Sequence, residues 1–132
     1  MNGRFLALAL VCGALVLPAA ARAGSLVGNA VRGAVVVRVR CSACHFVNRP
    51  EHKLGPSLLG IFERAPTISG VPFKRWDAQA LDAWLSGPRK VKINTTMVLP
   101  PLPPQDRADV IAYFARQKRR LMAAASASPG AP

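Results

Sequence analysis

Cysteine is scarce in this chain. Only three are present, and Cys12 lies in an apolar N-terminal stretch, which leaves Cys41 and Cys44 for the folded part. A structural zinc site takes about four ligands, usually as two pairs of this kind, so one pair argues against zinc. A thioredoxin-like redox pair is expected beside a strand–helix–strand pattern, and the sequence after Cys44 shows none.

Aromatic residues are also few, at 6% of a chain of 132 residues. This length predicts one small domain, which buries only a modest fraction of its surface. Domains of this size often need a further stabilising element besides their own core. The shortage of aromatic side chains is consistent with a core whose largest ring system comes from outside the chain.

Acidic residues are the third shortage, because 6 Asp and Glu stand against 18 Lys and Arg, for a formal charge of +12. Nucleic acid, an acidic protein and an anionic membrane surface would each be attracted by this balance. Charge alone does not choose between them. Export of the chain, for which the N-terminus gives evidence, argues against nucleic acid.

The apolar run at the N-terminus is too short for a comfortable membrane span. It covers Phe5–Leu17, about 13 residues, where a spanning helix needs about 20. Arg4 precedes it and Ala21-Arg22-Ala23 follows it, which completes the pattern of a secretory signal peptide over residues 1–23. An uncleaved anchor helix is the alternative. We therefore expect a periplasmic protein.

One short motif brings three reactive side chains together, Cys41-Ser42-Ala43-Cys44-His45. Two thiols three residues apart, with histidine directly after the second, form the attachment pattern of a c-type haem. On a helical turn residues i and i+3 share a face, so both thiols can add to the vinyl groups of one porphyrin. The histidine that follows can then bind the iron.

Helical patterns occur on both sides of this motif. In residues 24–40, Val27, Val31 and Val35 recur every four residues, as on a helical face, although the many valines leave a strand as the alternative. The glycine Gly33 is unfavourable in a helix unless a neighbour packs closely against it.

Two further helices are predicted near the C-terminus. Asp77 caps an amphipathic helix that Gly87-Pro88 ends, and a loop follows over residues 89–105. The last helix is expected to start at Gln105 or Asp106 and to run to about Leu121. Residues 122–132 then form a tail of Ala, Ser, Pro and Gly that we expect to be disordered.

The ordered set of these features resembles the small soluble monohaem cytochromes c of the mitochondrial and related bacterial type. The similarity runs from about Gly33 to Arg116 and includes the haem motif, the stretch His52–Arg64 and the terminal Asp106–Phe114. The resemblance implies an all-α fold of three to four helices packed around one covalently bound haem c, over residues 24–121.

Seven haem-site residues follow from the resemblance: Cys41, Cys44, His45, Pro56, Arg64, Trp76 and Met97. Both cysteines would hold the haem by thioethers, His45 would be the proximal iron ligand and Met97 the distal one. The Pro56 carbonyl would orient His45 through its second ring nitrogen. Arg64 and Trp76 would donate hydrogen bonds to a haem propionate, and Gly33 would let the first helix approach Tyr113 or Phe114 of the last.

Some positions depart from the family or offer alternatives. Glu63 stands where the family usually has glycine, and an acid there must face solvent or pair with an arginine. Asn94-Thr95-Thr96 replaces the familiar Gly-Thr-Lys before Met97, and Leu99 stands where an aromatic often occurs. His52 is the rival sixth ligand. Trp84 is expected in the core or the wall of the haem pocket.

The resemblance implies an electron carrier and not an enzyme, because a six-coordinate iron has no open position for a substrate. Arg89, Lys90, Lys92, Lys53 and Lys74 are either a docking face for acidic redox partners or a solvated surface. The chain would act as a monomer or as the electron-transfer subunit of a larger periplasmic oxidase or dehydrogenase complex, and a membrane-bound oxidase or dehydrogenase is among the partners that we consider. A thiol–disulfide oxidoreductase that uses Cys41 and Cys44 is the alternative of another class.

Overall fold

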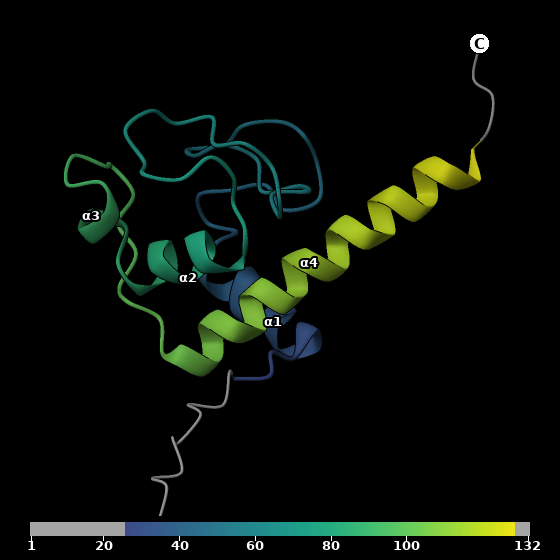
Figure 1. Cartoon of the computed structure of the whole chain (residues 1–132), viewed down its shortest axis with the longest axis horizontal. Helices are drawn as coiled ribbons and strands as arrows, with labels where there is room; N and C mark the ends of the chain where they lie inside the picture. The colour runs from purple at the N-terminus through teal and green to yellow at the C-terminus, as the bar shows by residue number, and fades with distance from the viewer. Residues whose placement is uncertain (1–25, 129–132) are drawn as a thin grey trace, which may run out of the picture.

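The computed structural model describes residues 26–128, and every regular element in that range is a helix. The four helices are α1 (Ala30–Arg40), α2 (Ala78–Ser86), α3 (Pro88–Val91) and α4 (Pro104–Ala127), shown in Figure 1. The long segment between α1 and α2 carries the cysteine motif and has no regular structure. The predicted all-α fold is confirmed. The proposed signal peptide lies outside the described residues.

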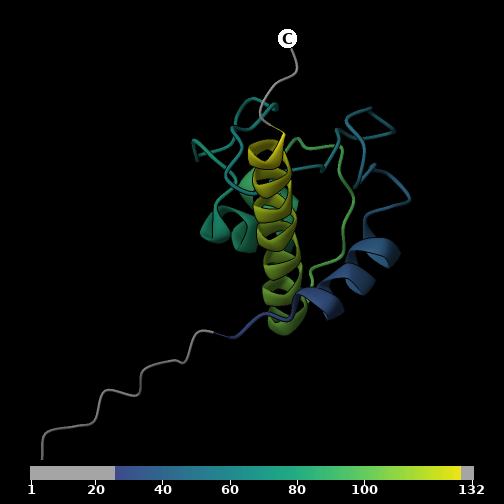
Figure 2. The ribbon, with the colours of Figure 1, turned by 90° about the vertical axis from the view of Figure 1, so that its right-hand side faces the viewer.

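The helix α1 packs against α4. It crosses behind α4 in Figure 1 and starts beside the lower part of α4 in Figure 2. Gly33 makes this close approach possible. A methyl group at Gly33 would collide with the backbone carbonyl of Asp109 and would lie 2.9 Å from Cβ of Tyr113. The predicted reason for this glycine is confirmed, although the nearest atoms belong to the α4 backbone and not to an aromatic ring.

The start of α1 lies later than the predicted Gly24. Asn29 caps the helix, since its side-chain oxygen accepts hydrogen bonds from the N–H groups of Val31 and Arg32, at 2.9 and 3.0 Å. A cap of this kind satisfies donors that the first turn leaves unpaired, which fixes the helix start at Ala30. The alternative of a strand is wrong.

The core lies between α2, α4 and the irregular segment before α2. Its buried apolar residues come from α1, α2, α4 and the loops: Val37, Cys41, Ile61, Trp76, Ala80, Leu81, Trp84, Leu85, Leu102, Val110 and Phe114. The Asp77 carboxylate caps α2 by accepting from the N–H of Ala80 at 2.8 Å. The helix ends at Ser86, before Gly87, where the sequence predicts it.

Two boundaries after α2 differ from the prediction. The expected loop over residues 89–105 begins with the short helix α3, which has a proline at its first position, where no backbone donor is needed. The last helix also has a proline at its first position, Pro104. It continues through Met122–Ala127. The prediction of disorder is wrong for those six residues, because alanine and methionine are strong helix formers. No helix within residues 26–128 has the length and apolar character of a membrane span.

Candidate functional site

The cysteine motif lies directly after α1. The N–H of Cys41 still donates to Val37, at 2.9 Å, and the N–H groups of Cys44 and His45 both donate to the Cys41 carbonyl, at 3.0 and 2.9 Å. The turn therefore continues the helical path and presents both thiols and the imidazole from one short segment. Both cysteines are free thiols, Cys41 buried and Cys44 exposed.

The environment of Cys41 is unsuited to thiol–disulfide exchange. Burial raises the pKa of the Cys41 thiol to about 11, so this group is protonated at neutral pH. Reactive thiols have lowered pKa values, because the thiolate is the nucleophile. The structure thus gives a physical reason against the thiol–disulfide alternative.

The imidazole of His45 is buried and held in one orientation. Its Nδ1 lies 2.7 Å from the carbonyl oxygen of Pro56, the contact that the resemblance implies. Because a carbonyl only accepts hydrogen bonds, Nδ1 carries the proton and Nε2 has its lone pair free for a metal. Gly55 lies flat against the ring, and a methyl group there would be 2.7 Å from Nδ1.

The partly buried guanidinium of Arg64 lacks one acceptor. Arg64 donates from Nη1 to the Leu59 carbonyl at 3.0 Å and from Nη2 to the Ser57 carbonyl at 2.6 Å. Its Nε is buried and has no hydrogen-bond partner among residues 26–128. Burial also lowers the pKa of Arg64. A buried N–H without an acceptor is unfavourable, and a carboxylate such as a haem propionate would satisfy it.

Trp76 and Arg64 are brought together by the backbone. The N–H of Trp76 donates to the Arg64 carbonyl at 2.9 Å, and the N–H of Glu63 donates to the Trp76 carbonyl at 3.0 Å. The indole is buried and makes edge contacts with Phe73 and Trp84, at centroid distances of 4.7 and 5.3 Å. The predicted pair of propionate donors is therefore adjacent.

The predicted distal ligand, Met97, is half-buried and packs against the core. Its Sδ accepts a hydrogen bond from Nε1 of Trp84, at 3.2 Å. Trp84 is buried, as expected of a core or pocket residue, but its donation to the methionine sulfur is a contact that the sequence did not predict. His52, the rival ligand, is exposed.

Comparison with known proteins agrees with this arrangement. The family model named Cytochrome c matches residues 30–118. The chain belongs to the cytochrome c family. The relatives named cytochrome c from Gossypium barbadense, Cannabis sativa and Ulva intestinalis are 37%, 35% and 33% identical to it in alignments 98 residues long, and these alignments cover 66% of this chain and 88% of each relative. The protein is thus an electron-transfer protein with one covalently attached haem c, and it is not an enzyme.

The residues of this cytochrome c fit a haem. Two free thiols and an oriented imidazole lie on one turn, and the Arg64 Nε needs an acceptor that no residue in the described range provides. The unusual Glu63 does not oppose this fit. Its backbone φ is +61°, in the left-handed region where glycine is favoured, and its carboxylate pairs with Arg75 at 3.2 Å. Pairing with an arginine is one of the two arrangements that we expect of an acid at position 63.

Two further residues support the site from α4, and sequence reasoning missed both functions. The Gln117 side chain donates to the Val47 carbonyl at 2.8 Å and accepts from the N–H of Gly60 at 2.9 Å, which ties the loop after the haem motif to the helix. Asp109 is buried and binds the start of α1. Both contacts join residues far apart in sequence, so no local pattern reveals them.

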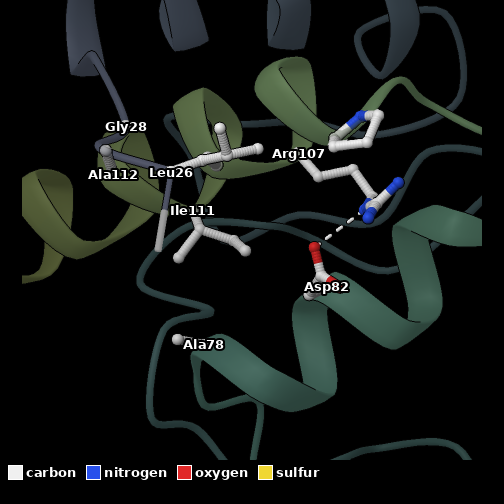
Figure 3. Close-up of a pocket in the computed structure, with 9 residues that line it drawn as sticks. Leu26, Gly28, Ala78, Asp82, Arg107, Ile111 and Ala112 are labelled. Carbon is white, nitrogen blue, oxygen red and sulfur yellow. Dashed lines mark hydrogen bonds and ion pairs between the residues drawn. The ribbon is translucent and has the colours of Figure 1, made fainter. Parts of the chain in front are cut away.

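Two open cavities border the cytochrome c fold. The larger, of about 360 Å³, lies between α2, α4 and the segment before α1, and it contains the ion pair of Asp82 and Arg107 at 2.7 Å (Figure 3). None of the seven predicted haem-site residues lines it. The second, of about 330 Å³, is lined by Met97 and by the basic residues Arg89 and Lys90. The cationic surface of α3 therefore borders the predicted distal ligand.

Proposed function

We propose that this cytochrome c is an exported carrier of single electrons in which His45 and Met97 bind the haem iron. The observation that carries the proposal is the 2.7 Å contact between His45 Nδ1 and the Pro56 carbonyl, since it directs Nε2 of His45 to the metal. Cys41 and Cys44 would fix the haem through thioethers. The haem, when bound, supplies the one-electron chemistry.

Met97 is the methionine best placed for the distal position. The other methionine in the described range, Met122, is exposed near the end of α4. The indole N–H of Trp84 donates a hydrogen bond to the Met97 sulfur, which would limit rotation of this flexible side chain. A thioether opposite an imidazole raises the reduction potential relative to other ligand sets. Both axial positions would then be filled, which is consistent with electron transfer alone.

Arg64 and Trp76 would bind a propionate of the haem. The support for Arg64 is its buried and unpaired Nε, and the support for Trp76 is its backbone pairing with Arg64. A propionate beside a guanidinium remains ionised, because an opposite charge favours the charged form.

Export is supported by the signal-peptide pattern of residues 1–23. If haem attachment is of the bacterial type, it takes place outside the cytoplasm, which an exported chain satisfies. N-terminal sequencing of the haem-loaded protein from the periplasmic fraction tests this directly. A mature chain that begins at Gly24 is expected, and a haem protein that retains its N-terminal Met and remains in the cytoplasm would contradict export.

Acidic redox partners would dock near the haem edge on the exposed side chains of Arg89 and Lys90, with Lys92 close by. Lys53 belongs to the same charge class, and its Nζ donates to the Ser42 carbonyl in the haem motif at 2.8 Å. Contacts of this kind are weak and sensitive to salt. The rate of electron transfer to an acidic partner protein should fall as ionic strength rises, and a flat rate from low to moderate salt would contradict this docking.

Absorption spectroscopy tests the haem and its ligands. Sharp reduced bands that survive denaturing extraction are expected from covalent attachment at Cys41 and Cys44. A weak far-red band of the oxidised protein should be lost in Met97→Ala and kept in the control Met122→Ala. A colourless protein with two alkylatable thiols, made in cells with haem-maturation machinery, would overturn the proposal.

A further inference from the structure

The helix α1 has a second apolar face, which points away from the core. We call it the valine face: Val27, Val31, Val35 and Val39. Their exposed fractions are 86%, 65%, 49% and 66%. The last three lie on α1 at intervals of four residues, so they share one strip of the helix surface, and Val27 precedes the helix at the same interval. Single exposed apolar residues are common, but a contiguous strip marks an interaction site.

The fold itself does not require the valine face. The face of α1 that packs against α4 is formed around Gly33 and Val37, which are buried. Valine is a poorer helix former than lysine, glutamine or glutamate, because its branched side chain loses rotamer freedom in a helix. Polar residues at Val31, Val35 and Val39 would therefore stabilise α1 better, and the valines need an explanation outside the folded chain.

The charges beside the valine face limit what can cover it. The helix carries Arg32, Arg38 and Arg40 and no acidic residue. Arg32 is paired with Asp109, whereas Arg38 and Arg40 are exposed next to the valines. A complementary surface is therefore apolar in its centre and bordered by carboxylates.

A second copy of this chain does not offer such a surface. Most of its six carboxylates already have an internal role: Glu63, Asp82 and Asp109 in ion pairs and Asp77 as the cap of α2. Two valine faces packed together would instead bring arginine against arginine. Residues 1–25 of the chain contain two arginines and no acidic residue, so the same argument applies to them.

A membrane surface is also a poorer match. Helices that lie in the membrane interface insert Trp, Phe and Leu, and the valine face has only valines. Valine has a stiff χ1 angle and loses little side-chain entropy when it is buried. Such side chains favour a groove of fixed shape, which a folded protein provides.

We propose that the valine face docks this cytochrome c onto a partner subunit that offers an apolar groove bordered by carboxylates. This inference goes beyond the proposed function, because it adds a contact surface that is separate from the cationic surface of α3. The helices α1 and α3 do not touch one another. The subunit bound through α1 would thus leave the cationic surface of α3, beside Met97, accessible to a second redox partner.

The test uses the full chain, loaded with haem in its native cells and released by gentle lysis. Size-exclusion chromatography followed at a haem wavelength should show the wild-type protein in a complex larger than one copy of the chain. The double variant Val31→Gln/Val35→Gln should elute as a free monomer. Met122→Gln is the matched control, because Met122 is also an exposed apolar residue on a helix, and it should elute with the complex.

The partner is then identified by photo-crosslinking from benzoylphenylalanine at position 31 and purified. Burial of the exposed parts of Val31 and Val35 predicts that the double variant binds the purified partner about tenfold more weakly than wild type. The haem spectrum should be unchanged in every variant, since Val31 and Val35 are exposed and lie outside the haem motif. A wild-type protein that lacks the bands of a covalently bound haem would question the proposed function, not the docking surface.

Four results would overturn the proposal. The wild-type protein could elute as a free monomer, or the double variant could elute and bind like the wild type. The purified wild-type chain could form a dimer that the double variant loses, which would assign the face to a second copy. Flotation with phosphatidylglycerol vesicles that depends on Val31 and Val35 would assign it to a membrane.

Discussion

The carboxylate of Asp109 joins the two terminal helices, and Asp109→Asn should destabilise the protein strongly. Its Oδ1 accepts from the backbone N–H of Asn29 at 2.7 Å and from Nε2 of Gln105 at 2.9 Å. Its Oδ2 accepts from Nε of Arg32 at 2.7 Å. An asparagine amide would remove the charge and would place a donor against the donors of Arg32. The variant therefore loses the link between the start of α1 and α4.

The size of the loss follows from burial. Hydrogen bonds to charged groups contribute about 1.5–3 kcal/mol each. Asp109 is 2% exposed, but the Arg32 side chain is 58% exposed and regains water when the pair is broken. We therefore expect a loss of about 2–3 kcal/mol in the free energy of unfolding. Asp82→Asn is the control, because its pair with Arg107 has the same 2.7 Å length, but the carboxylate is 48% exposed. It should lose about 0–1 kcal/mol.

The ion pair of Asp109 with Arg32 makes the difference in unfolding free energy between wild type and Asp109→Asn depend on pH. The hydrogen bond from Arg32 holds the pKa of Asp109 well below its usual range. A lowered pKa in the folded state gives stability that is complete above the unfolded pKa of about 3.9 and is lost as pH falls toward the folded pKa. The gap between wild type and Asp109→Asn should thus be full at pH 7 and shrink below about pH 4.

Guanidinium unfolding followed by far-ultraviolet circular dichroism, at pH 7, 5, 4 and 3, measures this gap. The reasoning is refuted if Asp109→Asn unfolds at pH 7 with the free energy of the wild type. A loss of the same size in Asp82→Asn, or a gap that widens below pH 4, would refute it equally.

Three further substitutions test the close contacts. Gly33→Ala should lose about 1–3 kcal/mol of unfolding free energy through collision with the α4 backbone, although alanine is the better helix former; a gain would show that α1 can shift. Gly55→Ala would press a methyl group against His45, so the ratio of haem absorbance to protein should fall severalfold, and unchanged loading would contradict the tight fit. In Trp84→Phe the indole N–H is removed. The positive end of this group faces the Met97 sulfur and disfavours the oxidised iron, so redox titration of the variant should show a potential lower by about 20–60 mV. An unchanged or higher potential would mean that this hydrogen bond does not act on the iron.

Local patterns in the sequence predict the parts of the structure that depend on a few neighbouring residues. The cysteine motif continues the path of α1, and Asp77 and Gly87 mark the ends of α2, because caps and turns are set within one or two helical turns. The contact between His45 and Pro56 was available only through the resemblance to cytochromes c, since eleven residues separate the two in the chain.

The periodicity of the sequence could not show which face of α1 is buried. Val27, Val31 and Val35 recur every four residues, and the same interval relates Gly33 to Val37 on the other face. A period shows that a helix has faces, but burial is decided by which face another helix can approach. Here the absence of a side chain at Gly33 lets the α4 backbone come close, and the bulkier valines remain outside.

Long-range charge pairs were equally hidden. Asp109 has a sufficient local explanation as an acid in the N-terminal part of a helix, where the dipole favours it. Its actual partner, Arg32, lies 77 residues away and becomes a neighbour only through helix packing. The same holds for Gln117, whose contacts with Val47 and Gly60 depend on how the loop folds against α4.

The scarcity of acidic residues connects the interior of this cytochrome c with its surface. Three of the six carboxylates form internal ion pairs, so the positive charge at the surface is left for partners to balance. The two contact surfaces should then differ in their response to salt, because the valine face adds burial of apolar side chains to its charged border. Screening weakens an encounter that depends on Arg89 and Lys90, whereas sulfate strengthens burial of the valine face. A salt titration that slows electron transfer while the complex through α1 persists would show that one chain uses two surfaces of different chemistry.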